Sequence, residues 1–336
     1  MTASFPLLKL PLIALEPIIN QLDFLDLVQL SMKSTKLTGI LQLLKLSVGT
    51  LNVCLTERLY EISILHNCNL SYIVACDSIP VDTITKPVKI QGEPVNIWKD
   101  GRSVLKVQSN SAKLATLEAI TKHVLSFCKV AKCVATFKGG RTEIRSLFIW
   151  QLTTQLDKFD IFPYHGSHVP ISSEDLIFLL EDISIEFLFL NVSCPGFKYQ
   201  RPIKHPVFSI ESPSWIDFDQ FSLGPETITA NFYDQKVSNA VLNRLIENWT
   251  EGKNPKLRKV YFAWDDNDSE SLVMAREHKI RPPKPILPNR NIDQLKGLCI
   301  NHRMFYQFRH QSVYYEVRLS VEEDLDLNGI HLEDQA

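Results

Sequence analysis

The sequence predicts an α+β fold: three N-terminal helices, a small antiparallel β section, and then an α/β domain. Three observations support this prediction. The first 46 residues place apolar side chains at helical spacing. Residues 50–108 alternate apolar and polar side chains between turn signals, as strands do. From Ser111 onward, helical patterns alternate with short apolar runs, which is typical of strands in a sheet covered by helices.

The N-terminal segment is unusually apolar. Residues 5–46 contain 23 hydrophobic residues among 42, against 45% for the whole chain. Two sets of side chains follow the spacing i, i+3, i+4, i+7: Leu15, Ile18, Ile19 and Leu22, then Leu37, Ile40, Leu41 and Leu44. Between them, Asp23 and Asp26 are predicted to cap a further short helix. Three such short helices cannot bury all of these apolar side chains by themselves. Some of the side chains must therefore face the rest of the chain or another protein.

Several landmarks occur in order in this segment: the Leu10-Pro11 pair, a helix ending at Leu22, the Asp26-Leu27 step and the run Leu30-Ser31-x-x-Ser34-x-Lys36. With these residues the segment resembles an F-box. In that family the segment docks onto a small Skp-type adaptor, which bridges to the cullin scaffold of a ubiquitin ligase. The resemblance implies a docking surface formed by Leu10, Pro11, Leu15, Ile18, Ile19, Leu22, Leu27, Leu30 and Ser31.

Two positions depart from the family pattern. Pro17 lacks a backbone donor, so we expect the first helix to start near Glu16, with Pro17 in its first turn. Leu37 stands near the last helix, where the family commonly has tryptophan. The alternative interpretation is an N-terminal helical hairpin that packs on its own domain.

The β section, residues 50–108, is defined by alternating runs and turns. Leu51 to Leu55 form one run, and two further strands are expected around Val95 and Val104. The Asp100-Gly101 pair predicts a hairpin turn between these two strands.

The helix-strand part carries a weak repeat of the form L-x-x-L-x-L. It starts at Leu156, Ile185 and Leu257, with a poorer copy at Val130. Helices are expected before these strands, among them one that starts at Ser172 or Ser173. Either degenerate leucine-rich-repeat-like units or an ordinary α/β sheet would produce this pattern.

Residues 237–252, the Asn254-Pro-Lys-Leu257 passage and the strand to Phe262 resemble the F-box-associated domain (second type) of nematode-type F-box proteins. The resemblance implies that residues 111–321 form a domain that recruits a protein substrate. Strand candidates at 303–308 and 313–321 close this domain, and the acidic tail 322–336 is expected to be frayed.

Alternate residues of the repeat strands are expected to point outward. They combine charged with aromatic side chains, as interaction hot spots do. The candidate substrate-binding residues are Lys158, Asp160, Phe187, Phe189, Lys259 and Tyr261. The poorer copy would add Lys132 and Val134. In the alternative interpretation, helices or the tail strands cover Phe187 and Phe189.

Composition argues against several function classes. A net charge of −2 and a pI near 6.5, without basic runs, argue against nucleic-acid binding. Seven cysteines without a C-x-x-C pair suit reduced thiols in a cytoplasmic or nuclear protein. No segment has the pattern of a membrane span or a signal peptide.

Signals for catalysis and cofactors are weak. The sequence has no phosphate-binding glycine loop, no G-x-S-x-G and no H-E-x-x-H. His165 and His168 are too few ligands for zinc, and the acidic run 265–270 lacks the glycine of a calcium loop. We therefore expect no enzyme activity, no cofactor and no metal.

Together these features predict the substrate-recognition subunit of a Skp–cullin–F-box (SCF) ubiquitin ligase, with an unknown protein target. Two alternatives stay open. One is an adaptor-bound interaction protein without a ligase role. The other is a hydrolase whose catalytic residues lie too far apart in the sequence to form a recognisable motif.

Overall fold

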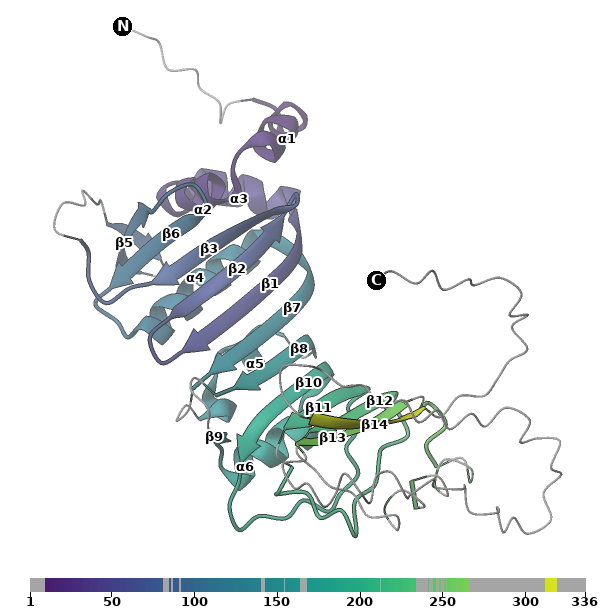
Figure 1. Ribbon diagram of the computed structural model, residues 1–336. Coiled ribbons are helices and arrows are strands. Elements are labelled where there is room, and N and C mark those ends of the chain that lie inside the picture. Colours follow the sequence, from purple (N-terminus) through teal and green to yellow (C-terminus); the bar gives the residue numbers. More distant parts are fainter. Residues whose placement is uncertain are drawn as a thin grey trace, which may run out of the picture. The chain divides into compact units, whose positions relative to one another are not determined.

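The computed structural model describes residues 10–80, 85, 87–90, 92–139, 143–153, 155–163, 168–211, 213–233, 241, 244–245, 248, 251, 253–257, 259–265 and 312–318 (Figure 1). Its contacts divide the chain into two units, Met1–Cys194 and Pro195–Ala336. The chain combines three N-terminal helices with extensive mixed β-sheet, as the α+β prediction requires. Among the described residues, no helix is long and apolar enough to cross a membrane.

The three predicted N-terminal helices are present as α1 (Leu12–Gln21), α2 (Phe24–Lys33) and α3 (Thr35–Leu44). The Asp23 carboxylate caps α2, because it accepts hydrogen bonds from the backbone N–H groups of Leu25 and Asp26 at 2.9 and 3.3 Å. Ser34 caps α3 by accepting from the N–H of Leu37 at 3.2 Å. The predicted cap at Asp23 is therefore confirmed.

The predicted start of the first helix near Glu16 is wrong. Helix α1 begins at Leu12 and continues through Pro17. An internal proline costs a helix about 3 kcal/mol. The extra turn places Leu15 in line with Ile19, and both are buried, at 2% and 1% exposure. Burial of two such side chains contributes about 3–6 kcal/mol, which offsets the lost hydrogen bond.

The first unit contains one mixed sheet. Its strands are β1 (Leu46–Thr56), β2 (Tyr60–His66), β3 (Asn69–Ala75), β4 (Val88–Ile90), β5 (Glu93–Lys99), β6 (Val104–Ser109), β7 (Cys128–Lys138), β8 (Gln155–Phe162), β9 (Val169–Pro170) and β10 (Ser184–Ser193). Their order is β4-β5-β6-β3-β2-β1-β7-β8-β10, and β9 pairs with β10.

The β section contains two hairpins, of which one was predicted. Strands β5 and β6 pair antiparallel around Asp100 and Gly101, so the predicted hairpin is confirmed. Strands β2 and β3 form another hairpin, in which Asn67 and Cys68 both have positive φ, as in a type I′ turn. One strand pair in this section differs from the prediction that all of its strands pair antiparallel. Strands β3 and β6 run parallel, because the chain between them first forms the two outer strands β4 and β5.

The helix-strand part supplies the parallel strands. Strands β1, β7, β8 and β10 pair in parallel, and β7, β8 and β10 coincide with the predicted strands. Helix α4 (Lys113–Phe127) contacts β2, β3, β6 and β7 and covers one face of the sheet (Figure 1). The segments η2 (Ile144–Ser146), α5 (Ile149–Leu152), α6 (Ser173–Ile177) and η3 (Phe178–Asp182) follow. The likeness to a leucine-rich repeat stays a prediction.

Polar contacts hold the N-terminal helices to the rest of this unit. Lys99 on β5 forms ion pairs with Asp26 at 2.5 Å and Asp23 at 3.7 Å, at the start of α2. The Lys45 ammonium, after α3, donates to the Ser126 carbonyl on α4 at 2.9 Å. These contacts join α2 to the sheet and the end of α3 to α4.

The second unit contains β11 (Val207–Glu211), β12 (Thr229–Tyr233), β13 (Lys259–Asp265) and β14 (Ser312–Arg318). The first three pair in parallel, and β14 pairs antiparallel with β13. Its core is aromatic, with Trp215, Phe208, Phe221 and Phe232 at most 1% exposed. A helix was expected before the strand that starts at Leu257, and the described residues Arg244, Leu245 and Asn248 are helical there. The strand candidate at 303–308 and the tail 322–336 lie outside the described residues.

We predict that Asp23→Ala lowers the free energy of unfolding by about 1 kcal/mol, because α2 loses its cap. Asp23→Asn should lose less than half as much, since asparagine also caps helices while the half-exposed ion pair to Lys99 contributes little. Urea unfolding of both variants tests this. Equal losses in the two variants would show that the charge of Asp23, rather than the cap, carries the effect.

Candidate functional site

The N-terminal helices expose an apolar surface. Five of the eight large hydrophobic side chains that are exposed among the described residues lie on these helices. They are Leu12 (41%), Ile13 (84%), Ile18 (36%), Leu30 (45%) and Leu43 (73%). We call this set the helical apolar surface. Burial inside the chain would normally stabilise such side chains, so their concentration in one short segment of three helices indicates a contact surface.

The predicted adaptor-docking residues fall into two groups. Leu10, Pro11, Ile18, Leu22 and Leu30 are at least partly accessible. The buried ones are Leu15, Ile19, Leu27 and Ser31, none more than 2% exposed. The buried group packs the helices, while the accessible group could meet a partner. Sequence reasoning missed Leu12, Ile13 and Leu43, because a nearly continuous apolar run does not show which side chains face outward.

Ser31 connects α2 to α4. Its hydroxyl donates to the Val28 carbonyl at 2.7 Å and lies 2.9 Å from Nε2 of His123. Because the hydroxyl proton is used, the Ser31 oxygen accepts from Nε2–H. Burial lowers the pKa of His123, so a neutral ring makes this bond at neutral pH.

The structure brings four predicted substrate-binding residues together on one face of the sheet. Strands β8 and β10 are in register, with Lys158 opposite Phe187 and Asp160 opposite Phe189. The Lys158 ammonium lies 2.7 Å from Asp160 and 5.2 Å from the centre of the Phe187 ring. Phe189 stacks on Phe162, with ring centres 4.5 Å apart. Both Phe187 and Phe189 are half-buried. We call Lys158, Asp160, Phe187 and Phe189 the sheet-face cluster.

Asp160 is the most constrained member of this cluster. It is 4% exposed, and its Oδ1 has no hydrogen-bond partner among the described residues. Burial raises the pKa of its carboxyl group, and the hydrogen bond and charge of Lys158 oppose that rise. A buried acceptor without a partner is costly, so Asp160 is held there at a cost in stability.

A polar row continues this face across the neighbouring strands. The Thr136 hydroxyl on β7 donates to Oδ1 of Asn52 on β1, and Nδ2 of Asn52 donates to the Ser63 hydroxyl on β2, both at 3.4 Å. Thr136 stands in register with Asp160. Sequence reasoning missed this row, because it depends on which strands become neighbours.

The remaining predicted substrate-binding residues, Lys259 and Tyr261, lie on β13 in the second unit. Their side chains are outside the described part of the structure. Their role stays a prediction.

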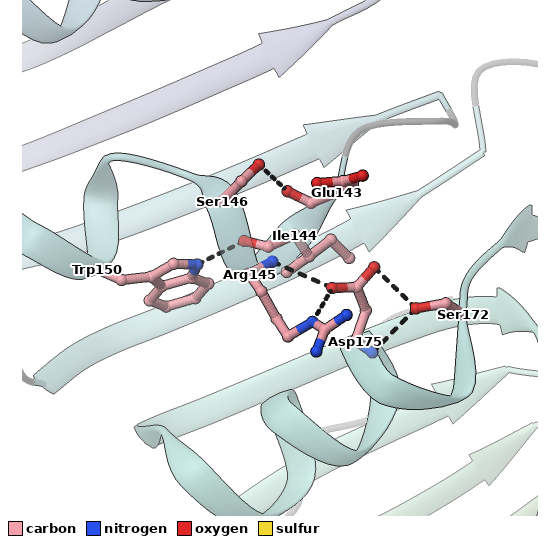
Figure 2. Close-up of polar contacts among 7 residues, drawn as sticks. All are labelled: Glu143, Ile144, Arg145, Ser146, Trp150, Ser172 and Asp175. Carbon is pink, nitrogen blue, oxygen red and sulfur yellow. Dashed lines mark hydrogen bonds and ion pairs between the residues drawn. The ribbon is translucent and has the colours of Figure 1, made fainter.

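A second polar cluster surrounds the buried Asp175 (Figure 2). Its Oδ1 accepts from the backbone N–H and from Nε of Arg145, both at 3.1 Å, and its Oδ2 accepts from the Ser172 hydroxyl at 3.0 Å. Ser172 also caps α6, since it accepts from the Asp175 N–H at 3.0 Å. Next to this cluster is a cavity of about 280 Å³. The sequence predicted the helix start here but neither the cluster nor the cavity.

The described residues offer little for metal binding, and two of the described thiols are unreactive. They contain no group of three or more His, Cys, Asp or Glu side chains that could hold a metal ion. His165 lies outside the described residues, while Nδ1 of His168 is 2.6 Å from Oδ1 of Asn191. Burial raises the pKa of Cys128 to about 12 and that of Cys133 to about 11, which makes both thiols poor nucleophiles.

Comparison of the chain with protein-family models, with curated proteins and with solved structures found no match. The resemblance to an F-box therefore rests on the residues of the N-terminal segment alone.

We predict that replacement of Asp160 by asparagine changes the pH dependence of stability. Because the folded pKa is raised, the cost of the buried carboxylate is absent at low pH. It develops as the pH rises from the unfolded value of about 4 through the folded pKa. The stability of Asp160→Asn relative to the unmodified chain should therefore increase from acidic to neutral pH. Urea unfolding at several pH values measures this difference.

The exposed Asp182 provides the control, because Asp182→Asn makes the same charge change at the surface. A stability difference for Asp160→Asn that stays constant or falls with rising pH would contradict the assignment of a raised pKa.

Proposed function

We propose that this protein is the substrate-recognition subunit of an SCF-type ubiquitin ligase. Its N-terminal helices would bind a Skp-type adaptor, and its sheet-bearing part would bind a protein target. The observation that carries the proposal is the helical apolar surface, five exposed large side chains on a segment that also has the order of landmarks of an F-box.

The apolar character of these side chains suits a protein partner. Burial of a leucine or isoleucine side chain contributes about 1.5–3 kcal/mol. Several such side chains buried together can offset the loss of translational and rotational freedom on association. The ion pairs of Lys99 and the Ser31–His123 hydrogen bond fix α2 in place, so little further ordering of this helix would be needed on binding.

The sheet-face cluster supports the target-binding half of the proposal. Phe187 and Phe189 offer aromatic surface beside the charge of Lys158, a combination that is common in the energetic centres of protein interfaces. No covalent step is required of this protein. Its contribution would be proximity, which raises the effective concentration of a target lysine near the charged ubiquitin carrier.

An adaptor-bound protein without a ligase role is the alternative. It shares the helical apolar surface, so only the cullin separates the two functions. Co-purification of a cullin with the complex of chain and adaptor supports the ligase function, and an adaptor complex that excludes the cullin supports the alternative.

We predict that the chain, co-expressed with a Skp-type adaptor, elutes as a one-to-one complex in size-exclusion chromatography. Leu30→Asp should abolish this complex, because a carboxylate would be buried in an apolar contact. Leu65→Asp is the matched control, since Leu65 on β2 is 38% exposed, against 45% for Leu30, and lies outside the helices. The proposal would be contradicted if the folded chain did not bind the adaptor, or if both variants disrupted the complex equally.

We also predict that the double variant Phe187→Ala with Phe189→Ala stays folded but no longer binds its protein target. Both rings are half-buried, so each truncation should cost less than the about 3–5 kcal/mol of a fully buried phenylalanine, and loss of the stacking contact to Phe162 adds about 0.5–1.5 kcal/mol. Quantitative proteomics of cells should show proteins that decline with the unmodified chain but not with this variant. Leu59→Ala with Leu70→Ala, at two exposed leucines of the first unit, is the control. Loss of the thermal transition in the phenylalanine variant would show that these rings are core.

A further inference from the structure

The cavity beside Asp175 lies where two parallel strands end. It is lined by residues at or just after the ends of β7 and β8, by η2, and by the segment that leads into α6. The lining includes Phe137, Gly139, Glu143, Ile161, Ile171 and Asp175. In open α/β sheets, ligands bind at the carboxyl ends of the strands, which is the location of this cavity.

The lining combines apolar walls with acidic groups. The walls come from Phe137 and Ile161 on the sheet and from aliphatic side chains of the segments that follow. The charged side chains among the described lining residues are both carboxylates, those of Glu143 and Asp175. A ligand with a negative group would be repelled, and a ligand with a positive group would be attracted.

The Asp175 carboxylate is fixed before any ligand arrives. It accepts three hydrogen bonds, two from Arg145 and one from Ser172 (Figure 2). A carboxylate has about four acceptor sites, so one remains available. Arg145 balances the charge of Asp175, and the exposed Glu143 adds a further negative charge at the cavity. The polar side of the cavity thus combines one carboxylate held by hydrogen bonds with one exposed carboxylate.

The size of the cavity limits the ligand. At about 280 Å³ it is slightly smaller than the 300–1,000 Å³ of typical small-molecule pockets. It suits a short aliphatic stem with one charged head. The stem would bury apolar surface against Ile161 and Phe137, while the head would lie near Glu143.

We propose that this cavity binds an organic cation, an ammonium or guanidinium group on an aliphatic stem. A lysine or arginine side chain of a bound peptide and a free alkyl amine or guanidine share this chemistry. The proposal goes beyond the proposed ligase function, because it requires neither an adaptor nor a cullin, and its test contains neither.

The test is an NMR titration of the full chain, labelled with ¹⁵N, with butylguanidinium at low salt. We expect saturable shifts of the backbone amide signals of Gly139 and Ile171. Affinity for butylguanidinium should be at least about tenfold higher than for 1-butanol, which has the same stem without charge, and butyrate should not bind. Binding should weaken as salt is raised, because the carboxylate of Glu143 is exposed.

Amino-acid substitutions test whether butylguanidinium binds in this cavity. Glu143→Gln should weaken butylguanidinium binding about threefold to fivefold, the upper part of the range for an exposed ion pair. Glu174→Gln is the matched control, since this exposed carboxylate lies next to Asp175 in the sequence but outside the cavity lining, and it should leave the affinity unchanged. Ile171→Trp should fill the cavity and abolish binding. If that variant fails to fold, Glu143→Gln and its control decide the question.

Several outcomes would overturn the proposal: absence of binding, equal affinity for 1-butanol, or equal effects of Glu143→Gln and Glu174→Gln. A final arm distinguishes the sources of the cation. Tighter binding of acetyl-Gly-Arg-Gly-amide than of butylguanidinium supports the cation site and assigns it to a peptide side chain. Binding of butylguanidinium alone supports the site and assigns it to a free small cation.

Discussion

The parallel pairing of β1 with β7 is the constraint on which the first unit depends. Leu46 pairs with Cys128 at one end, and Thr56 pairs with Lys138 at the other. Helix α3 ends at Leu44, so that only Lys45 separates it from β1, and α4 ends at Phe127, directly before Cys128. The pairing therefore places the ends of both helices side by side, where Lys45 reaches Ser126. It also joins the hairpins of the β section to the parallel strands that carry the sheet-face cluster and the cavity.

Local features of this fold could be predicted from the sequence, because they depend on neighbouring residues. The cap at Asp23, the Asp100-Gly101 hairpin and the apolar strands are of this kind. The hairpin at Asn67 and Cys68 could not be predicted. Its turn needs positive φ at two positions and uses a cysteine where glycine is the usual signal. The partner of β1 could not be predicted either, because more than 70 residues separate it from β7 and periodicity does not encode pairing.

The candidate sites show the same division. The sequence placed Lys158, Asp160, Phe187 and Phe189 on one face, because alternation along a strand determines the face. It did not show that Asp160 is nearly inaccessible, since that depends on the neighbouring strands. The Asp175 cluster was missed for a similar reason. Its hydrogen bonds to Arg145 span 30 residues, and only the helix-capping role of Ser172 leaves a local signal.

The connection between α3 and β1 consists of Lys45 alone, which adopts the left-handed conformation with φ of 53°. A helix of ten residues is about 15 Å long, and one residue leaves no slack at its end. We therefore expect a displacement of α3 to act on β1 through this single residue and, through the hydrogen-bonded ladder, on β7. A partner bound to α3 would in this way influence the strand that joins the two parts of this sheet.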